Sequence, residues 1–416
     1  MKRKLLSLLL LPALLAGCAA PAGVTALTTA EEIPGDRADF QPRPDADAAI
    51  GGLGAELLRA VREPGKNTLL SPLSIALALS MTANGAAGDT LAELEALLGA
   101  DADALNANAA SLLDEYRDLG GSTVSNIANS LWLDDSLTAR EQFLSRCTAF
   151  YGAGVYQTDL ATEGARRAVN GWVEENTNGM IPEILTEAPP EETALLLVNA
   201  LYLKNTWENQ FEPVNTNTRI FTAADGTEAE TDFLSNGIRQ ERYFRTADAA
   251  GTVLPYDDGR LAFVAVLPDE GLDSWLEGLD GDTFPALLAA AEDTRLLLRM
   301  PKFEAEWGGE VRDALAALGL DAAFDPARAD FSGMGTTESG DPLFIGSVRH
   351  RAKIEVNEEG TEAAAATVVE VPSGGAAPAD YEELTLDRPF CYAVVDLERG
   401  VPLFLGTFER PQPAGG

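Results

Sequence analysis

The sequence predicts one large domain of the α+β class, because helical patterns are most frequent in its first half and strand patterns in its second. Residues 45–410 contain neither a second linker nor an internal repeat, so we expect a single domain there, followed by a short tail at 411–416. Regular alternation of strands and helices would instead indicate a βαβ fold, and the chain has no such order.

The first residues predict an exported protein. Lys2-Arg3-Lys4 precedes an apolar run, Leu5–Leu15, and small residues follow, which is typical of a secretory signal peptide at 1–17. The run is too short for a permanent membrane-spanning helix. Leu15-Ala16-Gly17-Cys18 also resembles the lipobox of bacterial-type lipoproteins, in which the cysteine is lipidated and becomes the new N-terminus. We therefore expect a lipoprotein anchored at Cys18 and facing the extracellular or periplasmic side; the alternative is a plain signal with an incidental cysteine.

Residues 18–44 are expected to comprise the lipidated cysteine and a flexible tether. They are rich in Ala, Pro, Thr and Asp and have no apolar period, so no folded element is predicted in them.

Apolar spacing predicts the main elements of the domain. Helices are expected within 72–99, divided at Asn84-Gly85, and within 165–185, broken at Asn178-Gly179. Leu195–Leu203 is a near-continuous apolar run, which indicates a strand buried on both faces. The other expected strands are a hairpin pair around Asp258-Gly259 (Val253-Leu254 and Leu261–Leu267), Leu296–Met300, Leu343–Ile345, Cys391–Leu397 and Leu403–Phe408.

The charge balance excludes some partners. A formal net charge of −36 opposes nucleic acids, anionic membrane surfaces and heparin-type polyanions, so we expect membrane contact only through the lipid on Cys18. Cys147 and Cys391 are too few for a disulfide framework, and we expect both to be buried as small apolar side chains.

The common catalytic motifs are missing from the sequence. His350 is the single histidine, so no histidine-pair zinc motif exists, and neither a Gly-x-Ser-x-Gly elbow nor a phosphate-binding Gly-x-x-x-x-Gly-Lys loop occurs. Paired carboxylates for glycoside hydrolysis stay open among 66 acidic residues, but nothing singles out two of them. We expect a structural histidine and no enzyme, cofactor or metal site.

Residues 353–378 combine conflicting local preferences. Gly360 offers a pivot, Ala363–Ala366 favour helix, and Thr367–Val371 favour strand. The stretch then ends in Pro and Gly residues at 372–378, which is typical of an exposed protease target. The alternative is an alanine-rich linker.

As a strand, this segment would have one uncharged face. That face carries Thr361, Ala363, Ala365, Thr367, Val369 and Val371, and the other carries Glu362, Ala364, Ala366, Val368, Glu370 and Pro372. Because its residues near Gly360 are small, the segment could enter between two strands with little steric resistance.

Glu358–Thr367 resembles the reactive-loop hinge of inhibitory serpins, and other motifs in the family's order extend this resemblance along the domain. They are 67–75 with 84–90, 126–132, 170–179, 198–207, 300–303, and 387–390 with 403–406. The resemblance implies the serpin fold, with a large central, mostly antiparallel sheet, smaller sheets, surrounding helices and an exposed reactive-centre loop at about 358–385.

The resemblance also implies a mechanism. Serpins are metastable monomers in which a protease attacks the loop, forms an acyl-enzyme and is trapped when the cut loop inserts into the central sheet. We expect such suicide inhibition of a serine protease, with a cysteine protease as the other candidate target. The alternative is a non-inhibitory serpin acting as a substrate or binding module. The implied hinge residues are Glu358, Glu359, Gly360, Thr361, Glu362, Ala363, Ala364, Ala365 and Ala366.

Further site residues follow from the same resemblance. The family's shutter positions, expected to form a satisfied buried polar network, are Ser71, Ser74, Asn199 and His350. Trp207 matches the breach, where insertion begins, and Lys302 and Glu358 match an ion pair at the loop base.

The family's usual spacing places the reactive bond at Gly374–Gly375, with Ser373, Ala376 and Ala377 as alternatives. All of these residues are small, and no arginine or lysine lies between Lys353 and Arg388. The expected target is therefore an elastase-like or subtilisin-like protease with small-residue specificity, and trypsin-like proteases are disfavoured.

Overall fold

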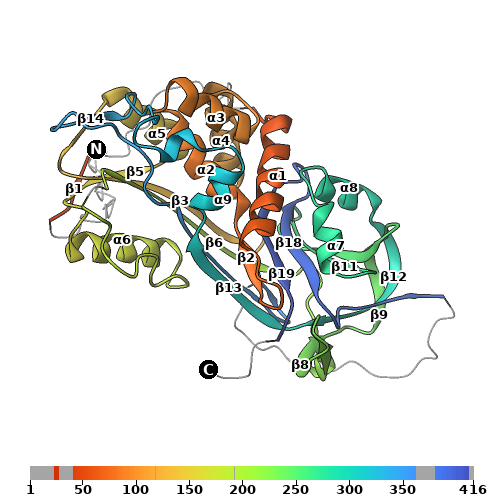
Figure 1. Ribbon diagram of the computed structural model, residues 1–416. Coiled ribbons are helices and arrows are strands. Elements are labelled where there is room, and N and C mark those ends of the chain that lie inside the picture. The colour runs from red at the N-terminus through yellow and green to blue at the C-terminus, as the bar shows by residue number, and fades with distance from the viewer. Residues whose placement is uncertain (1–22, 28–40, 118, 192, 362–379, 412–416) are drawn as a thin grey trace, which may run out of the picture.

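The computed structural model describes residues 23–411 except 28–40, 118, 192 and 362–379. Two large sheets form its frame, and most helices gather on one side of the central sheet, whereas α6 (Glu163–Asn176) lies on the other side (Figure 1). This is the α+β architecture that the sequence predicts.

The remaining helices mostly precede the strands of the second sheet along the chain. They are α1 (Pro44–Val61), α2 (Pro72–Ala83), α3 (Gly88–Leu98), α4 (Ala102–Glu115), α5 (Glu141–Tyr151), α7 (Leu272–Glu277), α8 (Thr283–Ala290) and α9 (Arg312–Ala317), with short 3-10 turns η2 (Pro213–Asn215) and η3 (Ala322–Phe324).

The predicted helix boundaries are confirmed. The side chain of Ser71 caps α2 by accepting a hydrogen bond from Ser74 N, and the helix ends before Asn84-Gly85. A Cβ on Gly85 would lie 2.0 Å from Met334 Cγ, so the chain needs glycine there. Helix α6 ends just before Asn178, whose positive φ of 52° cannot continue a right-handed helix.

Seven strands form the central sheet in the described part of the chain. Their order is β1 (Thr25–Ala26), β5 (Gly154–Gln157), β3 (Val124–Leu133), β6 (Leu195–Thr206), β16 (Gly360–Thr361), β15 (Arg349–Val356) and β13 (Phe303–Glu310). Only β3 and β5 pair in parallel, so the prediction of a mostly antiparallel central sheet is confirmed.

The second sheet has ten strands among the residues that the structure describes. Their order is β2 (Thr68–Leu70), β19 (Pro402–Phe408), β18 (Phe390–Asp396), β11 (Leu261–Pro268), β10 (Ala249–Pro255), β9 (Ile238–Arg245), β12 (Glu292–Pro301), β8 (Glu228–Leu234) and β7 (Asn217–Thr222), with β17 (Glu382–Thr385) parallel to β12. A small sheet pairs β4 (Leu137–Ala139) with β14 (Gly335–Thr337). The predicted hairpin around Asp258-Gly259 is formed by β10 and β11.

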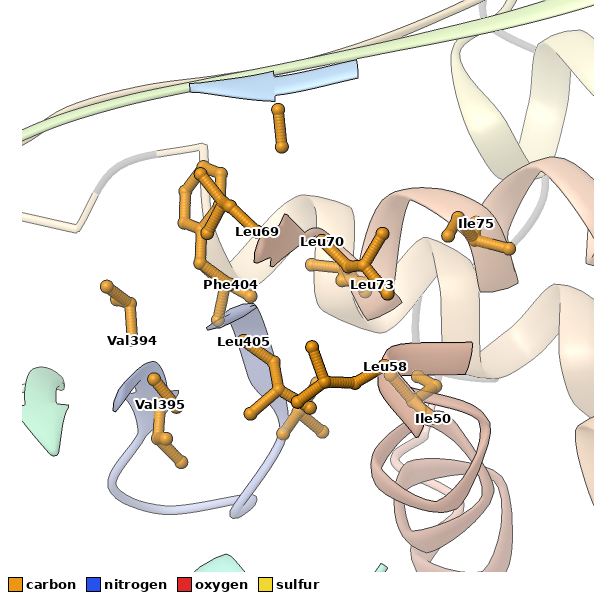
Figure 2. Close-up of a cluster of buried hydrophobic side chains, with 14 of the residues drawn as sticks. Ile50, Leu58, Leu69, Leu70, Leu73, Ile75, Val394, Val395, Phe404 and Leu405 are labelled. Carbon is orange, nitrogen blue, oxygen red and sulfur yellow. The ribbon is translucent and has the colours of Figure 1, made fainter. Parts of the chain in front are cut away.

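The main core joins the helices to the second sheet. Figure 2 shows Leu58 of α1 beside Leu405 of β19, with Leu69, Leu70 and Leu73 from the β2–α2 segment nearby; all five are fully buried. A second apolar cluster lies between α6 and the central sheet, and it includes Trp132, Val169, Val173, Leu196 and Val198.

Three expectations need correction. Leu343–Ile345 is not a strand: Leu343 and Ile345 are buried without sheet pairing, and Ile345 N donates to Ala323 O. The predicted tether contains β1. Finally, the reactive loop expected at 358–385 includes two strands of sheets among its described residues, β16 and β17.

Candidate functional site

The hinge segment enters the central sheet between β6 and β15. Gly360 pairs with Thr206 and Thr361 with Asn205 on β6, and Thr361 also pairs with Val356 on β15. The short strand β16 therefore separates two long neighbours at one end of the sheet.

Glycine is required at the hinge because the backbones approach closely. A Cβ on Gly360 would lie 1.9 Å from Asn205 O, which is inside any permitted contact. Thr361 is 1% exposed, and its Oγ1 is 2.5 Å from the hydroxyl of buried Tyr256. Of the hinge residues that the structure describes, Gly360 and Thr361 are thus seated in the interior, and Glu358 and Glu359 are half-buried.

Beyond β16, the facing edges of β6 and β15 have no strand between them in the described part of the chain. Over Leu195–Lys204, β6 pairs only with β3, and over Arg349–Glu355, β15 pairs only with β13. We call the space between these two edges the slot. Unpaired backbone groups along such edges can accept an added strand.

Trp207 fixes the turn that leads into β16 at the hinge end of the slot. Its indole N–H donates to Asn357 O at 2.9 Å, its backbone N–H donates to Glu359 O, and its ring stacks on Tyr256 with centroids 4.8 Å apart. The Asn357 side chain accepts hydrogen bonds from the backbone N–H groups of Glu359 and Gly360, forming the turn that leads into β16.

Glu358 is fixed by two partners. Lys302 Nζ lies 2.8 Å from its Oε2, and Thr216 Oγ1 donates to its Oε1 at 2.9 Å. Burial alone would raise the pKa of Glu358, but the hydrogen bonds from Lys302 and Thr216 and the Lys302 charge hold it below its ordinary value. The expected ion pair is therefore present, and it anchors the first residue of the hinge.

His350 lies on the floor of the slot and is neutral. Burial lowers its pKa to about 4, so its ring is uncharged near neutral pH, and its Nε2 accepts a hydrogen bond from Ser71 N at 3.0 Å. Ser71 in turn caps Ser74 at the start of α2. This geometry gives the lone histidine a structural contact.

Asn199 does not join that chain of hydrogen bonds. Its amide N–H₂ donates to Asn129 Oδ1, and Asn129 donates to Tyr151 O, whereas the buried Asn199 Oδ1 accepts no hydrogen bond from the described residues. The expectation of one satisfied network is therefore wrong. Ser74, Asn199 and His350 nevertheless line one cavity of about 40 Å³ beneath the slot. An unpaired acceptor beside a cavity costs free energy, which a different arrangement could recover.

The comparisons with known proteins agree with this geometry. The family model described as "Serpin (serine protease inhibitor)" matches residues 48–411. The chain belongs to the serpin family. Serpins are generally protease inhibitors and not catalysts.

The relatives are widely distributed. Serpin-ZXA of rice (Oryza sativa subsp. japonica) is 35% identical over 83% of this chain and 91% of its own length. An uncharacterized serpin-like protein of Thermococcus kodakarensis is 32% identical over 88% of this chain and 85% of its own length.

Among solved structures, the thermophilic serpin tengpin in its native state matches with a TM-score of 0.85 and 30% identity, over 93% of this chain and 99% of that one. Tengpin in its latent state matches with a TM-score of 0.77, at 29% identity over 92% and 100%. The described serpin therefore resembles the native form of tengpin more than its latent form.

Several predicted residues fall outside the described part of the serpin: Cys18, Glu362–Ala366, the bond Gly374–Gly375 and its alternatives Ser373, Ala376 and Ala377. Sequence reasoning missed Tyr256, Asn129 and Thr216, which contact the site through long-range folding and carry no local signal. Asn357 could have been found, because an asparagine two or three residues before a glycine is typical of a side-chain-capped turn.

Within the described ranges, no helix is long and apolar enough to cross a membrane, and no His, Cys, Asp and Glu side chains cluster in a way that could hold a metal ion. Cys147 and Cys391 are buried free thiols, and burial raises the pKa of both.

Proposed function

We propose that this serpin traps a target protease as a covalent acyl-enzyme by inserting its cleaved reactive loop into the slot. The observation that carries the proposal is β16, which already occupies the first two positions between β6 and β15. Below it, two facing strand edges lack a partner in the described chain, as strand addition requires.

The length of the slot fits the expected cleavage site. If the register of Thr361 with Asn205 continues, each later residue pairs with the preceding residue of β6, and Val371 reaches Leu195 at the end of that strand. A cavity of about 410 Å³ follows, lined by Thr193, Leu195, Phe344 and neighbouring residues. It has room for the next few residues, so a segment that ends near Gly374 fills the slot and the cavity.

The chemistry of the two faces also fits. Thr361 faces the interior, so alternate residues from Ala363 to Val371 would face the same side, and all of them are uncharged. Thr367 would then lie opposite Asn199, whose buried Oδ1 needs a hydrogen-bond donor. A threonine hydroxyl can supply it.

We propose an elastase-like or subtilisin-like protease as the target and Gly374–Gly375 as the reactive bond. The support is the run of small residues from Ser373 to Ala377 and the lack of arginine and lysine between Lys353 and Arg388. We further propose that the protein is exported and anchored by a lipid on Cys18, on the strength of the signal-like residues 1–17.

A non-inhibitory role is the second candidate, because the fold alone does not specify inhibition. Thyroxine-binding globulin, solved in complex with thyroxine, shares the fold with a TM-score of 0.79 at 23% identity, over 88% of this chain and 99% of that one. Inhibition requires fast insertion, whereas a binding module or a substrate does not.

To test this, residues 19–416 are mixed with a pancreatic-type elastase and, separately, with a subtilisin. The products are analysed on denaturing gels and by intact-mass measurement. We expect a denaturant-stable complex and a released peptide that starts near residue 375. Loop cleavage without a complex, across a panel that includes cysteine proteases, would refute the proposal in favour of the second candidate.

Two matched variants sharpen this test. Ala363→Glu places a carboxylate on the face that would enter the interior, whereas Ala364→Glu places the same group on the opposite face, in register with Lys353 of β15. We expect the first variant to be cleaved as a substrate and the second to keep forming the complex. Equal behaviour of the two would contradict insertion in this register.

A further inference from the structure

The N-terminal segment is built into the edge of the central sheet. Thr25 and Ala26 pair with Gln157 and Tyr156 of β5 in antiparallel register. Just outside this pairing, Leu27 N donates to Val155 O at 2.8 Å, and Thr158 Oγ1 donates to Gly23 O at 3.1 Å. Gly23–Leu27, which we call the docking strand, therefore completes the side of the sheet that would otherwise end at β5.

One side chain holds the docking strand from beneath. Val24 is half-buried and packs on the apolar cluster under α6, which also includes Tyr156 and Trp172, whereas Thr25, Ala26 and Leu27 are exposed. Backbone hydrogen bonds plus a single apolar contact form a weak attachment, and such an attachment can be removed by local substitutions without unfolding the domain.

The docking strand lies at the end of the slot farthest from the hinge. Tyr156 pairs with Trp132, which pairs with Leu196, and Leu196 is nine residues before Asn205, the partner of Thr361. At the usual rise per residue this separation is roughly 30 Å. In Figure 1, β1 lies at one end of the long sheet, away from β8 and β9.

The chain between the expected lipid and the docking strand is short. Cys18 and Gly23 are five residues apart, which spans at most about 18 Å when fully extended. An undocked tether from Cys18 to Pro44 would span up to about 90 Å. A net charge of −36 gives the body no attraction to an anionic bilayer, so the docking strand alone decides how near the body lies and which end faces the lipid.

We propose that the docking strand orients the anchored serpin, with the far end of the slot against the lipid surface and the hinge end pointing away from it. The reactive loop is then presented to proteases arriving from solution. Because an inserting loop draws its cut end toward the far end of the slot, a trapped protease is carried to the membrane-proximal end. There it must lie beside the anchor, because the at most about 18 Å between Gly23 and the lipid cannot hold a folded protease of roughly 40 Å diameter. The orientation rests on the proposed lipidation of Cys18, and the fate of the protease rests also on the proposed trapping.

The test uses the full mature protein bearing its natural lipid, in phosphatidylglycerol-containing vesicles with an acceptor dye on a lipid headgroup. Donor dyes are placed on Asp135→Cys, directly after β3 at the far end, or on Val214→Cys, which is 80% exposed and lies near Glu358. The buried Cys147 and Cys391 do not compete for the dye, and a lipidated Cys18 has no free thiol.

We expect several-fold more energy transfer to the lipid from Asp135→Cys than from Val214→Cys. Leu27→Pro removes the N–H that donates to Val155 O, and it should bring the ratio toward one. Leu27→Ala keeps that N–H and should retain the difference. Equal transfer in the parent, an unchanged ratio in Leu27→Pro, or a Cys18 without acyl groups by mass would overturn the orientation.

The position of the trapped protease is measured in a separate experiment. With donor dye on the protease, formation of the covalent complex should raise energy transfer to the lipid above that of free protease. A covalent complex whose protease stays as far from the lipid as the hinge end would overturn the second half of the proposal. Failure to form any covalent complex counts against the trapping function, and the two-position measurement on the intact protein still decides the orientation.

Discussion

Replacing Thr361 with glutamate should convert the inhibitor into a substrate. Thr361 is 1% exposed, and among the described residues its hydroxyl hydrogen-bonds to the buried Tyr256 hydroxyl, so an ionised carboxylate there would be buried without a paired cation. Burying an uncompensated charge costs at least about 3 kcal/mol. At 1.36 kcal/mol per factor of ten, insertion should begin roughly 150-fold more slowly, whereas deacylation of the protease is unaffected.

The assay is the number of inhibitor molecules consumed per protease molecule trapped, read with the yield of denaturant-stable complex. We expect Thr361→Glu to be cleaved with almost no complex and Thr361→Ser, which keeps the hydroxyl, to behave like the parent. Thermal unfolding confirms that both variants fold. If Thr361→Glu traps protease at the parent's stoichiometry, entry of this residue into the sheet is not required, and the reasoning from its burial is wrong.

Other outcomes follow from the same contacts. Gly360→Ala should expel β16, because its Cβ would meet Asn205 O, and limited proteolysis of the hinge should become faster. The pKa of His350 falls to about 4 in the folded state, so burial of the neutral ring reduces the stability of the fold as the pH falls from 6.5 to 4, while above pH 6.5 this loss is absent. His350→Gln should remove up to about 3 kcal/mol of the pH dependence of the free energy of unfolding over that window. Lys302→Ala should lower the free energy of unfolding by only about 0.5 kcal/mol, since the lysine is 43% exposed, and the loss should shrink in 1 M NaCl, where its attraction to Glu358 is screened.

The sequence predicted the elements whose signals are local. Asn84-Gly85 predicts the end of a helix and Asp258-Gly259 predicts a hairpin turn, each from the residues themselves, and the structure has both. Leu343–Ile345 was predicted as a strand from its apolar character, but Leu343 and Ile345 are buried in the main core without sheet pairing. Apolarity predicts that a residue is buried, and it leaves the partner undetermined.

The site shows the same limit. The hinge and the ion pair were predicted because short motifs resemble those of the serpin family. The separation of Asn199 from His350 could not be predicted, because it depends on long-range pairing that places Asn199 opposite Asn129 and His350 beside Ser71 N. The docking strand was missed because Gly23–Leu27 has no period of its own, and a β5 edge 130 residues away makes it a strand. Pairing with a strand so far along the chain cannot be predicted from the local sequence.

The two residues of β16 also bear on the kinetics of insertion. Strand addition divides into initiation, in which a loose chain must find and close onto an edge, and propagation, in which each residue is placed beside one already paired. With Gly360 and Thr361 seated, initiation is complete before any protease arrives. Cleavage then only releases the far end, so insertion time should rise with the bulk of each successive residue, and the small residues Ala363–Ala366 come first in that sequence of steps.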